Sequence, residues 1–359
     1  MRGTLCLAVL SAIFVPATAA VQGFNSWVFN DDGTPKYQAD YEAEFKTARA
    51  LVGAPAGGFN SVRLSTMIQA NTRNTIVSAI PAAIATNTSL LLGIWCRGGT
   101  DFSVGTELAA LKAAVDAHGE KLATLVVGIA VGHEELASNS EAGSRSGAVG
   151  GLQPDDVVRF IMQTRAAIQN TALARVPVGH IDTWSAWANA SNQAVVVASD
   201  FLGMNFDLYS QQCAPNTIST AKILFDSARL MTKVAAIGRR PVWITEVGFP
   251  VSGSRSNGAV PSPLNAKYFW DVVGCPLLGT TNVWWKTLRD TGQGPPNNPS
   301  YGVVARDATA PLFDMSCAPG STYTKRSHSF EEKRKFQQEG GGQKKGDANM
   351  NKNKAAKGD

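Results

Sequence analysis

The sequence has few charged residues for its length. Asp, Glu, Lys and Arg make up only 17% of its 359 residues and only four residues are His, whereas 44% are hydrophobic. A surface poor in charge must rely on Ser, Thr, Asn and Gln, which suits a secreted, carbohydrate-facing protein better than a nucleic-acid binder. The hydrophobic content is enough for a sizeable core, in one large domain or two ordinary ones.

Motifs for a metal, a nucleotide or a haem are lacking. No two cysteines have CxxC spacing, and the run Gly132-His133-Glu134-Glu135 has no second histidine at the helical spacing that a zinc site requires. We therefore expect a function that needs no metal and no cofactor.

The first twenty residues are typical of a secretory signal. Arg2 is the positive n-region, Leu5–Val15 is the apolar h-region, and residues 17–19 read Ala-Thr-Ala, a cleavage pattern. The alternative is a membrane anchor, but the apolar run is short for a bilayer span. We expect residues 1–20 to be removed, giving a secreted protein with two N-glycosylation sequons, at Asn87 and Asn189.

Few cysteines remain after removal of the signal: Cys96, Cys213, Cys275 and Cys317. An even number in a secreted chain favours disulfides over metal binding. Four cysteines permit three pairings, and the sequence does not select one. A Cys275–Cys317 bond would connect the end of the core to a late helix.

Large aliphatic side chains are nearly missing from residues 321–359. From Lys325 to Asp359 there are ten Lys or Arg against five Asp or Glu, so this segment carries a net +5, equal to the net charge of the whole chain. Such a composition predicts a disordered tail. A basic tail could bind nucleic acid or an acidic surface, but we favour a solvated appendage, with no nucleic-acid partner.

Short β-rich runs alternate with longer helical stretches between residues 21 and 320. Several runs are continuously apolar, as expected of strands buried on both faces. Eight such alternations predict the α/β class and a single catalytic domain, a (β/α)8 TIM barrel. A doubly wound sheet is the competing fold, but the Gly-rich phosphate loop it often carries is missing here. The eight runs are Val21–Phe29, Ser61–Ser65, Leu90–Trp95, Leu125–Val131, Val176–Asp182, Phe201–Phe206, Pro241–Thr245 and Asn282–Lys286.

Polar and aromatic side chains gather where these runs end. In a barrel, the carboxyl ends of the strands carry the chemistry. Aromatic faces can stack on pyranose rings, and carboxylic acids can cleave the bond between two sugars. The polar run ends are Gly132-His133-Glu134-Glu135, His180-Ile181-Asp182-Thr183-Trp184, Asn205-Phe206-Asp207-Leu208-Tyr209, Thr245-Glu246 and Trp284-Trp285-Lys286.

The ends of the fourth and seventh runs, at residues 131–134 and 243–250, resemble motifs of glycoside hydrolase family 17, the β-1,3-glucanases and related glucanosyltransferases, most closely its fungal cell-wall members. Residues 131–134, Val-Gly-His-Glu, are similar to that family's Val-Gly-Asn-Glu acid/base motif. Residues 243–250, Trp-Ile-Thr-Glu-Val-Gly-Phe-Pro, are similar to its nucleophile motif. Residues 178–187 match a fungal signature on the fifth strand, and the resemblance extends over about residues 21–317.

The resemblance implies a retaining, double-displacement mechanism on β-1,3-glucan. Glu246 would attack the anomeric carbon, while Glu134 would protonate the departing oxygen and later activate water. A rim salt bridge is the alternative role for either glutamate. Glu135 is expected to turn away from the site, because neighbouring strand residues point to opposite faces.

Two residues depart from the family pattern. His133 replaces an Asn whose role is to bind the sugar hydroxyl beside the reacting carbon, and plain structural packing is its alternative role. Asp207 replaces a Tyr, and a carboxylate there is expected to repel Glu246 or to raise its pKa. Because of these two changes, a protein that lacks full activity remains an alternative.

The other predicted substrate-binding residues are weaker assignments. Arg63 is predicted to orient an acid, with a structural ion pair as its alternative, and Asn205 and Tyr209 to contact substrate. Core packing is the alternative role for the two tryptophans among the predicted cleft-lining residues. Those four residues are Asp182, Trp184, Trp285 and Lys286.

Three functions remain open at this stage. The first is hydrolysis of β-1,3-glucan, as in a glucan endo-1,3-β-glucosidase. The second is transglycosylation through the same intermediate, and the third is a glucan-binding protein with impaired catalysis. In each case we expect a secreted monomer, extracellular or in the cell wall, with β-glucan as partner and no membrane span once the signal is removed.

Overall fold

The computed structural model describes residues 20–55, 57–96, 101–145, 150–210, 217–238, 240–290, 298–306 and 308–317. Eight parallel strands form a closed barrel in sequence order. The predicted (β/α)8 TIM barrel is confirmed, and each of the eight predicted runs overlaps one strand. The strands are β1 (Gln22–Ser26), β2 (Ser61–Leu64), β3 (Ser89–Ile94), β4 (Val126–Val131), β5 (Val178–Thr183), β6 (Leu202–Asp207), β7 (Val242–Gly248) and β8 (Val283–Trp285).

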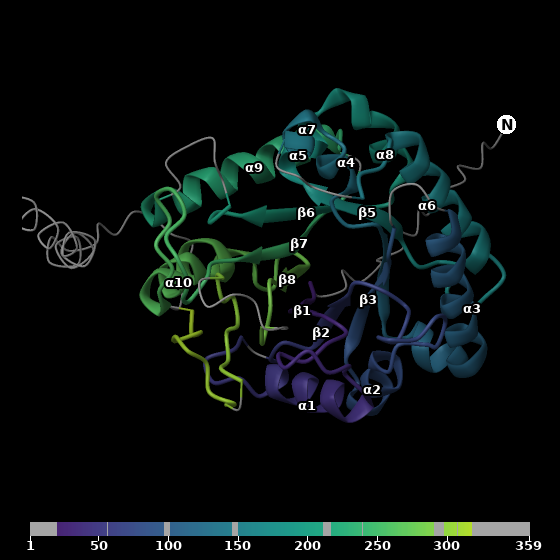
Figure 1. Ribbon diagram of the computed structural model, residues 1–359, viewed down its shortest axis with the longest axis horizontal. Helices are drawn as coiled ribbons and strands as arrows, with labels where there is room; N and C mark the ends of the chain where they lie inside the picture. Colours follow the sequence, from purple (N-terminus) through teal and green to yellow (C-terminus); the bar gives the residue numbers. More distant parts are fainter. Residues whose placement is uncertain are drawn as a thin grey trace, which may run out of the picture. The chain divides into compact units, whose positions relative to one another are not determined.

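Helices surround the strands, as Figure 1 shows. The main covering helices are α1 (Gln38–Arg49), α2 (Ala79–Thr86), α3 (Asp101–Ala123), α6 (Pro154–Ile168), α8 (Gln193–Ala198), α9 (Ala221–Ala235) and α10 (Pro263–Phe269). Shorter helices follow the carboxyl ends of β4 and β5, namely α4 (Glu135–Ser138), α5 (Glu141–Arg145), α7 (Trp184–Ala188) and η1 (Ala190–Asn192). The remaining short elements are η2 (Ile218–Thr220), η3 (Trp270–Gly274) and η4 (Cys275–Leu277).

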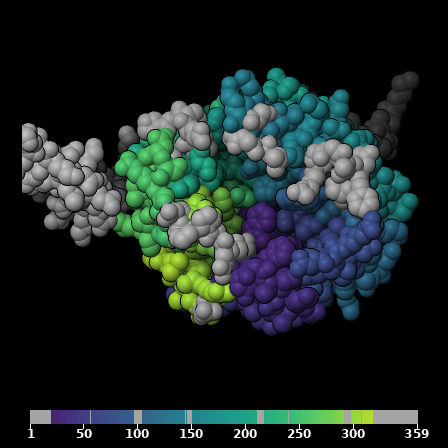
Figure 2. Space-filling model, in the orientation of Figure 1, coloured from purple at the N-terminus to yellow at the C-terminus, as the bar shows by residue number. Residues whose placement is uncertain are grey.

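The barrel closes where the first strand pairs with the last. Gly23 of β1 lies opposite Trp284 of β8 and also opposite Ser61 of β2. In Figure 2 the purple N-terminal part of the barrel accordingly adjoins the yellow-green C-terminal part. Closure leaves the barrel without a free sheet edge, and it brings side chains from both ends of the sequence to one rim.

The barrel interior is packed with aromatic side chains. The Trp243 ring stacks on Phe201 at 3.8 Å between centroids, and Trp284 lies 6.0 Å from Trp243. Gly128 makes room for this layer, since a Cβ there would lie 2.8 Å from the Trp243 ring. Such a filled interior is a core and not a channel, so substrate can reach the barrel only at its ends.

Helix α6 illustrates how the sequence covers the outside of the barrel. It opens on Pro154, with Asp155 and Asp156 in the first turn, where a fixed φ and negative charges favour a helix start. Its inward face is apolar and buries Phe160 and Ile161 against the strands. The same division into an apolar and a polar face recurs in α9.

One disulfide is present in the described part of the chain. Cys275 and Cys317 form a disulfide that joins η4 to the last described residue. Among the described residues Cys96 is a free, buried thiol, and Cys213 lies outside them. The expected signal (residues 1–20, of which only residue 20 is described) and basic tail (residues 321–359) also fall outside them. Within the described part of the chain, no helix has the length and apolar character to cross a bilayer.

Reducing the Cys275–Cys317 bond should destabilise the barrel. The bond closes a loop across a sequence separation of 42, for which chain entropy predicts a stabilisation of about 4 kcal/mol, and the usual measured range is about 2–5 kcal/mol. We expect a Cys275→Ser, Cys317→Ser double variant to lose that much free energy of unfolding in a urea titration. Cys96→Ala is the matched control, and it should leave the effect of a reductant unchanged. An unfolding midpoint that does not respond to a reductant in the wild-type protein would contradict this prediction.

Candidate active site

Glu134 lies where β4 turns into the short helix α4. Its backbone is in the left-handed region, with φ of 66°, and its amide donates to the Ile181 carbonyl of β5 at 2.9 Å. Gly132 makes the turn possible: its φ is 81°, and a Cβ there would lie 2.3 Å from the Glu135 carboxylate. Glycine is therefore needed at position 132, for its backbone as well as for space.

A chain of hydrogen bonds orients the Glu134 carboxylate. Thr245 Oγ1 donates to Asn205 Oδ1 at 2.8 Å, which leaves the amide nitrogen of Asn205 to donate to Glu134 Oε1, also at 2.8 Å. Thr245 and Asn205 are buried, whereas the Glu134 side chain is 37% exposed. Glu134 therefore has a fixed inner contact and an accessible outer edge, as proton transfer to a bound molecule requires.

A bulge in β7 sets the direction of Glu246. Met204 pairs with Ile244, but the next residue of β6, Asn205, pairs with Glu246 and not with Thr245. Thr245 is thus the extra residue of a β-bulge, a feature that re-aims side chains and is common beside active sites. The bulge lets two consecutive residues, Thr245 and Glu246, both serve the site.

Two cations lie against Glu246. Arg63 Nη1, from β2, is 3.4 Å from its Oε2, and Lys286 Nζ, which follows β8, is 3.4 Å from its Oε1. Arg63 is itself held by Asn25 Oδ1 at 2.5 Å, and the Asn25 amide donates to the carbonyls of Thr245 and Trp285. Strands β1, β2, β7 and β8 therefore fix this half of the site together.

The two glutamates share one neighbour. His133 Nε2 lies 3.5 Å from Glu246 Oε2 and 3.9 Å from Glu134 Oε1. Burial and the charge of Arg63 lower the pKa of His133 to about 3, so its imidazole stays neutral over the working range of most enzymes. The side chain can therefore offer polar contact between the two carboxylates without adding a charge.

The surroundings push the pKa values of the two glutamates apart. Burial and the negative charge of Glu246 raise the pKa of Glu134 to about 7. Burial also opposes the charge on Glu246, but its contacts with Lys286, His133 and Arg63 outweigh it and hold its pKa below the ordinary value. At neutral pH, one carboxyl group can thus hold a proton while the other is ionised, which is the division of an acid and a nucleophile.

Asp207 does not disturb Glu246 as expected from the sequence. Lys286 Nζ lies 2.9 Å from Asp207 Oδ2, between the two carboxylates, and the Tyr301 hydroxyl donates to the same oxygen at 2.8 Å. The expectation that Asp207 raises the pKa of Glu246 is wrong, since that pKa is lowered. The physical reason is that Asp207 forms an ion pair with Lys286, whose positive charge lies 3.4 Å from Glu246.

Several predicted cleft residues lie elsewhere. The structure does not place Asp182 at a surface: its side chain is fully buried under α4, where it accepts from the amides of that helix. Trp285 is also buried, with its ring 4.8 Å from that of Trp270, so core packing is its role here. Trp184 and Tyr209 are half-buried, and the Tyr209 hydroxyl donates to the Ser254 carbonyl.

Sequence reasoning missed four residues that bear on the site. Asn25, Trp27, His180 and Tyr301 were not singled out. Trp27 directly follows β1 and its ring lies 6.4 Å from that of His133, so the end of the first strand was a usable signal. Tyr301 follows the last strand by more than ten residues, and no strand-end argument could have found it.

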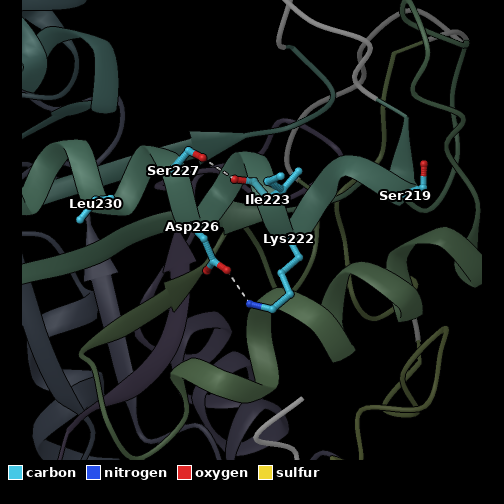
Figure 3. Close-up of a pocket in the computed structure, with 6 residues that line it drawn as sticks. All are labelled: Ser219, Lys222, Ile223, Asp226, Ser227 and Leu230. Carbon is cyan, nitrogen blue, oxygen red and sulfur yellow. Dashed lines mark hydrogen bonds and ion pairs between the residues drawn. The ribbon is translucent and has the colours of Figure 1, made fainter. Parts of the chain in front are cut away.

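Metal ligands and other cavities do not add to this site. In the described residues, no group of three or more His, Cys, Asp or Glu side chains could hold a metal ion. A separate pocket of about 440 Å³ lies along α9, lined by Ser219, Lys222, Ile223, Asp226, Ser227 and Leu230 (Figure 3). It contains none of the predicted site residues.

The family of the chain follows from its relatives. The model of the BtgE/BtgC glycoside hydrolase domain matches residues 23–297. A probable glucan endo-1,3-beta-glucosidase eglC from Aspergillus oryzae is 52% identical over 84% of this chain and 64% of its own length. Its Aspergillus fumigatus counterpart is 49% identical over 88% of this chain and 69% of its own length. The chain thus spans about two thirds of the length of these relatives.

Solved structures share the fold. A glycoside hydrolase family 17 beta-1,3-glucanosyltransferase from Rhizomucor miehei superposes with a TM-score of 0.63 at 20% identity, over 83% of this chain and 98% of its own. An endo-laminarinase from Formosa gives 0.60 at 11% identity, over 80% of this chain and 84% of its own. The chain belongs to the BtgE/BtgC glycoside hydrolase domain family, which confirms the glycoside hydrolase family 17 membership that its motifs predicted.

Proposed function

We propose that the protein is a retaining glycoside hydrolase that cleaves β-1,3-glucan, with Glu246 as nucleophile and Glu134 as acid/base. The observation that carries the proposal is the placement of two carboxyl groups beside one histidine, with two cations, Arg63 and Lys286, each 3.4 Å from Glu246. The pKa of Glu246 is accordingly lowered and that of Glu134 is raised. The names of the relatives support β-1,3-glucan as the substrate.

The first step breaks the bond between two sugars. The Glu246 carboxylate attacks the anomeric carbon, and the Glu134 carboxyl group gives its proton to the departing oxygen. The product is a glycosyl ester on Glu246, and the negative charge moves to Glu134. Lys286 and Arg63 keep Glu246 ionised before attack, and their charges then favour its departure as a carboxylate.

In the second step, Glu134 acts as a base. It takes a proton from water, which attacks the anomeric carbon and releases Glu246, so that the configuration of the sugar is retained. Another glucan chain can replace the water, which would make the protein a transglycosylase. The same two glutamates serve both outcomes, so the acceptor decides between them.

A protein that has lost catalysis has less support from the structure than it had from the sequence alone. Lys286 compensates Asp207, and the neutral His133 leaves the charge of Glu246 intact. We therefore favour an active enzyme over a protein that only binds glucan.

Secretion to the cell wall is part of the proposal. The expected signal at residues 1–20 supports it, as do two sequons whose asparagines, Asn87 and Asn189, are both exposed in the structure. Treatment of secreted protein with an endoglycosidase, followed by mass spectrometry of the peptides, tests whether these asparagines carry glycans.

Substitution of the two glutamates should give different patterns of loss. Glu134→Gln should slow cleavage of laminarin oligosaccharides about 10²–10⁴-fold, the usual contribution of a general acid. It should affect an activated dinitrophenyl glycoside much less, because that leaving group needs no proton. Glu246→Gln should abolish turnover of both substrates, as measured by reducing sugar and dinitrophenol release. Equal activity of Glu246→Gln and the wild type would rule out the assigned nucleophile.

The pH profile of kcat/KM should be bell-shaped. Glu134 must be protonated, so activity should fall as the pH rises through about 7. Glu246 must be ionised, so activity should also fall in acid, at a pKa below that of an ordinary glutamate. Lys286→Met removes a positive charge near both carboxyl groups and should move both limbs to higher pH. A shift of either limb to lower pH would be incompatible with this electrostatic assignment.

Products formed from laminarin oligosaccharides decide between hydrolysis and transfer. A hydrolase should yield only shorter chains, whose newly formed ends have the β configuration by NMR immediately after cleavage. Chains longer than the starting material, seen by mass spectrometry, would identify a transglycosylase. Initial release of α anomers would contradict the retaining mechanism in either case.

A further inference from the structure

His180 lies in a setting that fixes its protonation. Its side chain is fully buried, as is that of Asp182. Its Nδ1 is 2.6 Å from the Val131 carbonyl oxygen, and its Nε2 is 3.0 Å from Asp182 Oδ2. Both neighbours are acceptors, so each ring nitrogen must carry a hydrogen to make its contact. A neutral ring would leave one nitrogen lone pair facing an oxygen lone pair in a fully buried site.

The negative charge of Asp182 is therefore balanced by the positive charge of His180 inside the protein. Burial disfavours a charged His180, but the hydrogen bond to Asp182 outweighs it and raises the His180 pKa. Removal of one partner of such a buried pair would leave the other uncompensated. Glu135 lies at the same cluster and accepts from the His133 amide at 2.5 Å.

Asp182 holds the start of α4 by its carboxylate. Oδ2 accepts from the Leu136 amide at 2.9 Å, and Oδ1 accepts from the Ala137 amide at 3.3 Å. These are amides of the first turn, which the residue before a helix usually satisfies with its own side chain. That residue is Glu134, and its side chain makes no such bond. Asp182 takes over the capping, so the Glu134 carboxylate is free to face the site.

Strand β5 therefore determines where Glu134 points. The Glu134 amide donates to the Ile181 carbonyl, and the two amides that follow Glu135 donate to Asp182. These contacts hold a left-handed backbone at Glu134, a conformation that non-glycine residues rarely adopt. Without them, the turn and its side chain could relax away from Glu246.

We infer that His180 and Asp182 form a buried ion pair whose role is to position Glu134 for proton transfer. They are positioning residues and not catalytic ones, since neither reaches the surface of the site. This inference rests on the proposed function of Glu134 and adds to it: the acid/base is directed from the fifth strand. If the pair positions Glu134, a variant without the pair should lose more activity on a substrate whose leaving group needs a proton than on one whose leaving group does not.

The test compares two substrates in Asp182→Asn. Asparagine has the same shape but only one acceptor oxygen, so it cannot keep both amide contacts of α4 and the contact with His180. We expect kcat on laminarin oligosaccharides to fall about 10²-fold, as for a misplaced catalytic group, and kcat on a dinitrophenyl β-laminaribioside to fall less than about tenfold. The KM for either substrate should change little.

Glu44→Gln is the matched control. Glu44 pairs with Lys36 at 2.6 Å, and both side chains are buried, so this variant also breaks a buried ion pair but touches no contact of Glu134. Its effect should be equal on the two substrates. The inference is overturned if Asp182→Asn also loses activity equally on both substrates while its circular dichroism spectrum shows that it is folded.

Two further measurements keep the test decisive. If Asp182→Asn does not fold, His180→Gln gives the same comparison. The ¹⁵N spectrum of histidine-labelled wild-type protein, simple because the chain has four histidines, should show both His180 nitrogens protonated at a pH above the ordinary histidine pKa. A neutral ring would overturn the ion pair. A wild-type protein that cleaves neither substrate would instead remove the proposed function, and the positioning role with it.

Discussion

Two carboxylates in one site cannot both be ionised cheaply, and the architecture of this site follows from that constraint. At the 5–5.5 Å separation of a retaining pair, the repulsion is about 3 kcal/mol at an effective dielectric constant of about 20, or roughly two pKa units. Water screens part of this, because the Glu134 side chain is 37% exposed. The repulsion does not itself decide which group keeps the proton. The decision comes from the neighbours of Glu246, first Lys286 and then His133 and Arg63, which lower its pKa.

Closure of the barrel allows Arg63 and Lys286 to lie against the same glutamate, Glu246. Arg63 belongs to the second strand and Lys286 follows the eighth, so they meet at Glu246 only because β1 pairs with both β2 and β8. The bulge at Thr245 supplies the remaining adjustment, since it turns Glu246 toward these cations. On the other side, Asn205 and the fifth strand serve Glu134 alone. The two sets of supports meet at β7, because Thr245, the neighbour of Glu246, also orients Asn205, and His133 lies near both glutamates.

The sequence predicted the parts of this arrangement that depend on pattern. Eight apolar runs predicted the barrel, and residues at their ends predicted Glu134, Glu246 and Asn205, because side chains at strand ends share one rim. Contacts between side chains were not predictable in this way. Whether Asp207 would repel Glu246 depended on the position of Lys286, and whether Asp182 would line the cleft depended on where α4 begins. The position of one side chain and the start of a short helix leave no periodic signal in the sequence.

His133 shows how a departure from a family motif can be compatible with activity. A cationic histidine between the two carboxylates would stabilise both anions and so lower the pKa of the acid as well as that of the nucleophile. Burial and Arg63 instead keep the ring neutral, so it behaves as a polar group, like the amide of asparagine. The charge difference between the glutamates is then preserved, because the cations that create it lie on the side of Glu246 and not between the two.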